Sequence, residues 1–168
     1  MNYFRCMLVC ACLSSNSLAV AKEQATFADV CGVIAGQWVG PAASTARRYL
    51  AAQVEAICSH DGKQLMLMTT LETDAATSSW WFVQLPDRIQ LMQRDNHGKF
   101  RQIDVSLYDY GDGFSFLGLT EVNGREALLK LIFEPLAVGW QWQQQLQYLD
   151  DDSETYQVFL SVDLVPKV

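Results

Sequence analysis

Apolar and polar residues alternate with a period of two along most of the chain after residue 36. In 140–148 the even positions are mostly aromatic or aliphatic, whereas the odd positions are all glutamine. The runs 64–72, 101–108 and 156–164 alternate in a similar way. This period is that of a β-strand with one buried face.

Turn sequences separate these runs. Asp61-Gly62, Gly111-Asp112-Gly113 and Asn123-Gly124 supply the positive φ that tight hairpins need. The pattern predicts about ten strands, near 37–44, 48–59, 63–73, 78–84, 88–95, 100–109, 113–121, 125–134, 139–148 and 155–165. Because no crossover helix separates them, we expect an all-β, antiparallel up-and-down barrel of about 8–10 strands, whose closure removes exposed edges. A two-sheet sandwich is the alternative.

One stretch near the start of this region has helical spacing. Phe27, Val30, Cys31 and Ile34 recur at intervals of three and four, and Gly36 follows. The sequence therefore predicts a short N-terminal helix before the first strand.

The first 21 residues have the pattern of a secretory signal peptide. Arg5 precedes the apolar run 6–13, and Ala19-Val20-Ala21 places small residues before Lys22. We expect residues 1–21 to be removed and residues 22–168 to form one domain, periplasmic or secreted. A lipid anchor on Cys12 and an N-terminal element of the fold itself are the alternatives. The apolar run is too short for a membrane span.

The cysteine count is compatible with export. Of the five cysteines, only Cys31 and Cys58 lie beyond residue 21. An even number of cysteines in an oxidising compartment predicts a disulfide, worth roughly 3–4 kcal/mol for a loop of about 28 residues. Two unrelated buried thiols are the alternative.

Charge excludes some partners. The chain has 19 Asp and Glu residues against 12 Lys and Arg residues, for a net charge of −7. Phosphate backbones and anionic lipid surfaces bind basic patches, so we expect neither nucleic acid nor an anionic membrane surface as partner.

Two short motifs resemble known barrels. Gly36-Gln37-Trp38, with Gly40 beyond it, resembles the Gly-x-Trp motif that opens the first strand of lipocalins and related calycins. Trp140-Gln141-Trp142, the acidic turn Asp150-Asp151-Asp152 and Thr155-Tyr156 resemble the final hairpin of bacterial lipocalin-like domains of unknown function. The resemblance implies structural roles for Gly36 and Trp38 at the closed end of the barrel, and a ligand cup inside it. Lipocalins usually fasten the C-terminus by a disulfide, unlike the pair expected here.

Catalytic and metal-binding patterns are weak. His60 with Asp61, and His97 with Asp95, lie in predicted turns, where such residues are common without any catalytic role. The cluster 150–154 has the acidic character of a calcium site but lacks the alternating ligand spacing, so we interpret it as a solvated turn. The sequence predicts no catalytic residue, metal or cofactor, and haem lacks a histidine on a late strand.

Aromatic and methionine side chains are the candidates for an apolar ligand site. They are Trp81, Met66, Met68, Phe114, Phe116, Trp140 and Trp142. The same residues suit a solid core, and the pattern does not decide whether the glutamine face of 140–148 points inward or outward.

Three functions follow from these observations. The first is an exported barrel that binds a small, partly apolar ligand without converting it. The second is a solid-core module that contacts another envelope protein. The third is an isomerase or lyase that uses a pocket carboxylate such as Asp104.

Overall fold

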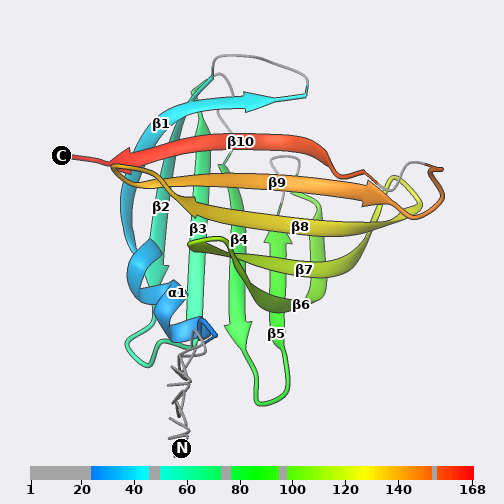
Figure 1. The fold of residues 1–168 in the computed structure, drawn as a ribbon, viewed down its shortest axis with the longest axis horizontal. Helices are drawn as coiled ribbons and strands as arrows, with labels where there is room; N and C mark the ends of the chain where they lie inside the picture. Colours follow the sequence, from blue (N-terminus) through cyan, green and yellow to red (C-terminus); the bar gives the residue numbers. More distant parts are fainter. Residues whose placement is uncertain (1–23, 46–49, 73–76, 95–97, 153–154) are drawn as a thin grey trace, which may run out of the picture.

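A computed structural model describes residues 24–45, 50–72, 77–94, 98–152 and 155–168 (Figure 1). The predicted signal peptide, residues 1–21, lies outside the described residues. The elements are α1 (Phe27–Ile34), β1 (Gly36–Ser44), β2 (Leu50–Cys58), β3 (Gln64–Leu71), β4 (Thr77–Gln84), β5 (Ile89–Arg94), β6 (Phe100–Tyr110), β7 (Gly113–Val122), β8 (Arg125–Pro135), β9 (Trp140–Tyr148) and β10 (Gln157–Pro166). Every predicted strand is present, and its ends differ from the prediction by at most two residues.

The ten strands form one closed antiparallel barrel. Each strand pairs with its neighbour in sequence, and β1 pairs with β10 to complete the ring. The predicted barrel is therefore confirmed, and the two-sheet alternative is wrong. In Figure 1, β2–β5 run almost at right angles to β7–β10, so the barrel is flattened into two crossing layers with the core between them.

A glycine allows the first and last strands to pair closely. A Cβ atom built on Gly40 would lie 1.7 Å from the backbone carbonyl oxygen of Asp163 in β10. Only glycine fits this approach, because the opposing atom belongs to the backbone and cannot rotate away. Gly40 therefore allows β1 to pair closely with β10. On either side of it, Val39 stands opposite Val165 and Ala42 stands opposite Val162.

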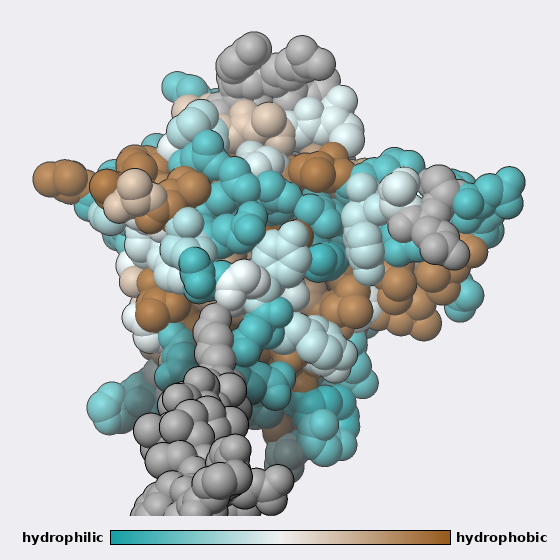
Figure 2. All heavy atoms as spheres, in the orientation of Figure 1, coloured by the Kyte–Doolittle hydropathy of each residue, from teal (hydrophilic) through white to brown (hydrophobic). Residues whose placement is uncertain are grey.

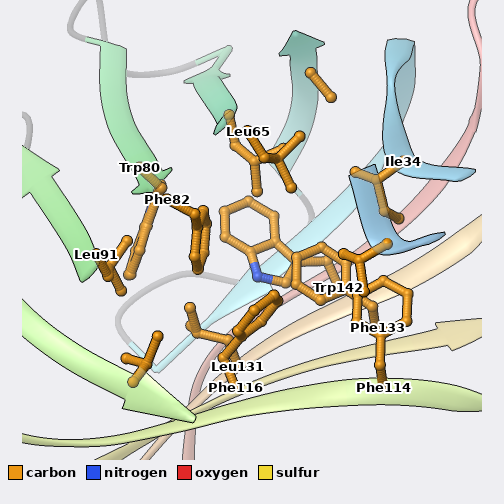
Figure 3. Close-up of a cluster of buried hydrophobic side chains, with 14 of the residues drawn as sticks. Ile34, Leu65, Trp80, Phe82, Leu91, Phe114, Phe116, Leu131, Phe133 and Trp142 are labelled. Atoms are coloured by element: carbon orange, nitrogen blue, oxygen red, sulfur yellow. The ribbon is translucent and has the colours of Figure 1, made fainter. Parts of the chain in front are cut away.

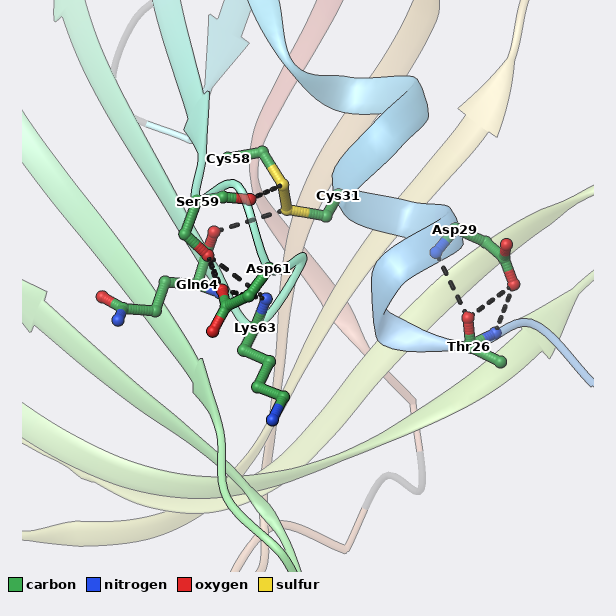
Figure 4. Close-up of a disulfide and its surroundings, with 8 residues drawn as sticks. All are labelled: Thr26, Asp29, Cys31, Cys58, Ser59, Asp61, Lys63 and Gln64. Atoms are coloured by element: carbon green, nitrogen blue, oxygen red, sulfur yellow. Dashed lines mark hydrogen bonds between the residues drawn. A yellow bond between two sulfur atoms is a disulfide. The ribbon is translucent and has the colours of Figure 1, made fainter.

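The helix closes one end of the barrel. Thr26 caps it: the Asp29 backbone N–H donates to Thr26 Oγ1 (3.3 Å), and the Thr26 backbone N–H donates to the Asp29 carboxylate (2.9 Å) (Figure 4). The apolar side of α1 is buried, and its Phe27 ring packs edge-on against Phe116, with centroids 6.3 Å apart. Trp38 of β1 donates from Nε1 to the Ile34 carbonyl oxygen at 2.8 Å. Trp38 thus joins the end of the helix to the start of the barrel.

The predicted disulfide is present. Cys31 of α1 is bonded to Cys58 at the end of β2, with Cα atoms 5.5 Å apart (Figure 4). The alternative of two unrelated thiols is therefore wrong. The bond fastens the closing helix to the barrel wall.

In the described part of the chain, no helix has both the length and the apolar character needed to cross a membrane.

Replacing Gly40 tests the closure. We expect Gly40→Ala to destabilise the protein by about 2 kcal/mol or more, because the new methyl group meets an immovable carbonyl. Gly32→Ala in α1 is the control, because a Cβ there meets nothing within 4 Å and alanine favours the helix. Urea unfolding measures both. Equal stability of the two variants would contradict the proposed role of Gly40.

Removing the disulfide tests how firmly it holds the helix. We expect the Cys31→Ala/Cys58→Ala variant to lose about 3–4 kcal/mol, since the bond closes a loop with a sequence separation of 27 residues. Reductant should lower the stability of the natural protein and leave the double variant unchanged. Free thiols in the oxidised protein would contradict the assignment.

Candidate functional site

The space between the two layers is occupied by aromatic rings (Figure 3). Phe116 packs on Phe82 with ring centroids 4.7 Å apart. Phe133 stacks on Phe114 at 5.1 Å and on Trp142 at 6.0 Å. Trp142 in turn meets Trp80 edge-on at 5.9 Å. These contacts run continuously from one layer to the other.

The exposure of these side chains indicates that they fill the interior. Trp80 is 2% exposed, Trp142 is 1% exposed, and Phe82 and Phe116 are 0% exposed. A cavity large enough for a ligand would leave its wall accessible to a solvent-sized sphere, and these rings are not accessible. The aromatic cluster therefore packs as a solid core.

Among the residues that the structure describes, two buried side-chain polar atoms have no hydrogen-bond partner. They are the hydroxyl oxygen of Thr69 in β3 and the indole Nε1 of Trp142 in β9. Buried polar groups are usually hydrogen-bonded, so both atoms are energetically unfavourable as they stand.

The seven predicted ligand residues divide between the two faces of the barrel wall. Phe114, Phe116 and Trp142 are buried inside, and partly buried Trp140 packs against Phe114 with ring centroids 5.6 Å apart. The structure brings these four residues into one cluster.

Trp81, Met66 and Met68 lie on the outer face instead. Trp81 is 38% exposed and stands directly opposite Met66 of β3 and Met92 of β5. Ile57 of β2, 49% exposed, stands opposite Met66. A row of apolar side chains therefore crosses four strands on the outside of the barrel. Such contiguous apolar surface is typical of contact sites.

The glutamine face of β9 also points outward, because Trp142 and Leu146 occupy the inner face. The amides form a head-to-tail chain. Gln145 Nε2 donates to Gln143 Oε1 (2.8 Å), Gln143 Nε2 donates to Gln141 Oε1 (2.6 Å), and Gln141 Nε2 donates to Asp163 Oδ1 (2.9 Å). We call Gln141, Gln143 and Gln145 the amide row. Figure 2 shows hydrophilic atoms over the middle of β9 and β10, where the row lies.

A shallow groove runs beside the amide row. It has a volume of about 400 Å³ and lies over β1, β10 and β9, lined by Pro41, Ala42, Ala43, Ser44, Gln141, Ser161 and Asp163. A second groove of about 260 Å³ lies over β1–β4 and includes the outward-facing Met68. Both are features of the outer wall.

A lysine is held between aromatic rings next to the amide row. Lys130 of β8 stands opposite Gln145, and its ammonium lies 4.4 Å from the Tyr110 ring centre and 5.4 Å from that of Tyr156. Cation–π attraction favours this arrangement. Burial raises the pKa of the Tyr156 hydroxyl above its ordinary value.

The acidic turn after β9 is a surface ion-pair cluster. The Arg125 guanidinium contacts Asp150 at 2.6 Å and Asp151 at 2.5 Å. The hydrogen bond from Arg125 lowers the pKa of Asp150. The carboxylates of Asp150 and Asp151, which a calcium ion would need as ligands, are thus paired with the guanidinium of Arg125.

The other candidate chemistry falls outside the barrel interior. Asp61 accepts hydrogen bonds from Ser59 Oγ (2.6 Å) and the Lys63 backbone N–H (3.1 Å), which lower its pKa and hold the turn beside His60. Asp95 and His97 lie outside the described residues.

Asp104 is 63% exposed and lies 3.4 Å from Arg88 on the outer face. Asp104 therefore does not lie in the barrel interior, where the isomerase or lyase alternative would need a pocket carboxylate. No group of three or more potential metal ligands occurs among the residues that the structure describes.

Phe133 is central to the core but is not among the residues that the sequence indicates. The alternation of its strand is the signal that identifies it as buried. Asp163 and Ser161 meet the amide row only through the pairing of β9 with β10, for which the sequence carried no separate signal.

No protein-family model matches the chain, and no curated protein matches it significantly.

Adjacent tryptophans test the inner and outer assignments. We expect Trp80→Ala to cost about 3–5 kcal/mol, because it empties a packed core site. Trp81→Ala should cost less than about 1 kcal/mol, because its side chain is on the outer face. Denaturant unfolding of both variants measures the difference. Similar losses would mean that the faces of β4 are assigned incorrectly.

Proposed function

We propose that this protein is an exported, non-catalytic binding module that meets its ligand or partner on the outer wall of a solid barrel. The observation that carries this proposal is the cluster of mutually packed, inaccessible rings between the two layers. With that volume filled, recognition takes place on the outer wall, where the amide row with its groove and the apolar row around Trp81 are two candidate surfaces.

The positions of the titratable groups support a non-catalytic role. Among the residues that the structure describes, no Asp, Glu or His is buried. General acids and bases are commonly tuned by burial beside a bound substrate. Several of the exposed carboxylates are engaged in turns and surface ion pairs, among them Asp61 and Asp150.

The disulfide supports an exported protein. Disulfides form and persist mainly in oxidising compartments, and Cys31–Cys58 fastens the closing helix. Together with the signal-like residues 1–21, this favours a periplasmic or secreted location.

A distant relationship to lipocalin-like barrels fits the same features. Gly36 has a φ of 144° and Trp38 packs at the closed end with its indole bonded to Ile34. These are the structural roles that the Gly-x-Trp resemblance implies for them.

A small-ligand carrier is the second candidate. The unpartnered atoms of Thr69 and Trp142 favour it, because a polar group of a ligand inside the barrel would satisfy them. It requires the aromatic cluster to open.

Binding of a neutral apolar dye, N-phenyl-1-naphthylamine, and of a long-chain fatty acid separates the two candidates. We expect no saturable binding to the natural protein, because no room exists beside the rings. Leu131→Ala, which opens a cavity in the same core, is the positive control and should gain dye binding.

Saturable binding of one dye or fatty acid per chain to the natural protein, with quenching of buried tryptophan fluorescence, would overturn the solid-barrel proposal and favour the carrier. If Leu131→Ala does not fold, Leu129→Ala in the same strand serves as the control.

A further inference from the structure

The amide row is an ordered array of hydrogen-bonding groups. Its three amides are linked in one direction and end on a carboxylate oxygen of Asp163, at distances of 2.6–2.9 Å. A primary amide has two N–H donors and two acceptor lone pairs. Each glutamine that both donates and accepts within the row therefore keeps one donor and one acceptor for a ligand.

The row is held in place on both sides. Gln143 lies between Ile132 of β8, which is 1% exposed, and Ser161 of β10. Gln145 lies opposite Lys130, whose ammonium is clamped by two tyrosine rings. Side chains that are ordered before binding lose less conformational entropy when a ligand arrives.

The groove combines an apolar floor with a polar wall. Pro41 and Ala43, on the outward side of β1, contribute hydrocarbon surface, whereas Gln141, Asp163 and Ser161 contribute amide, carboxylate and hydroxyl groups. The floor side chains are small, so a flat molecule can lie close to the sheet. The volume of the groove, about 400 Å³, matches a small organic unit rather than a folded domain.

Charge restricts the chemistry of the ligand. Asp163 is the one ionisable residue among those that line the groove, and the chain carries a net charge of −7. An anionic ligand would be repelled, and a purely apolar ligand would leave the carboxylate and amides without partners. Neutral hydroxyl groups both donate and accept, so they satisfy amides and carboxylates alike.

We propose that the amide row and the adjacent groove bind a neutral saccharide chain. A pyranose ring has an apolar C–H face for the floor of the groove and hydroxyl groups for its wall. Further sugar units continue along Gln143 and Gln145. This inference rests on the proposed outer-wall binding function and names the ligand class of one of its surfaces.

Titration with neutral hexasaccharides tests the inference. The probes are maltohexaose, cellohexaose, chitohexaose and a β-1,3-glucan hexamer, with glucose alongside. The readout is the side-chain amide NMR resonances of ¹⁵N-labelled protein. We expect at least one hexamer to produce saturable shifts of Gln141 and Gln143 at concentrations up to about 10 mM, and to bind about tenfold more tightly than glucose.

Matched variants locate the site. Gln141→Leu/Gln143→Leu should weaken binding of that hexamer at least about tenfold. Gln90→Leu, a glutamine on the outer face of β5, should leave the affinity unchanged. Thermal unfolding confirms that both variants are folded. Asp163→Asn, which keeps a hydrogen-bonding side chain, should bind more tightly than Asp163→Leu.

Two results would overturn the saccharide inference: no saturable shift with any of the hexamers, or equal affinity in the double variant and the natural protein. Neither result would contradict the outer-wall function. That function is contradicted by a different observation, which is the binding of a dye or fatty acid inside the barrel.

Discussion

The pairing of β1 with β10 is the contact on which the rest of the structure depends. It joins the two ends of the meander, and it requires the backbone of Gly40 to lie against the carbonyl of Asp163. Closure leaves no unpaired strand edge in the barrel and encloses one space between two crossing layers. The helix, fastened by Trp38 and the Cys31–Cys58 bond, then covers one end of that space.

What fills the enclosed space determines where function can lie. The aromatic cluster crosses from β4 to β9 through the contact between Trp80 and Trp142, and both rings are almost inaccessible. Solid packing makes the wall rigid, and a rigid wall can hold outer side chains in fixed positions. The amide row on β9 is an example, because the same strand presents Trp142 to the core and Gln141 to the groove.

The sequence predicted the strands well because each depends on local alternation and each turn on local glycine, aspartate or asparagine. It did not indicate which face of 140–148 was buried, since neither face carries charge. The pairing of Trp142 with Phe133 and Val162 settles that orientation. Alternation at 80–82 separates Trp81 from Trp80 and Phe82, but it does not indicate which of the two faces is the inner one. The contact between Gln141 and Asp163 follows from strand register, which a single sequence does not reveal.

The barrel is filled by its own side chains. The most direct test is a crystal of the protein pressurised with xenon, because xenon enters dry apolar cavities and is visible in electron density. A barrel filled by these side chains admits no xenon in the region bounded by Trp80, Phe116 and Trp142. An ordered xenon atom among these three rings would contradict this packing and indicate room for a ligand inside the barrel.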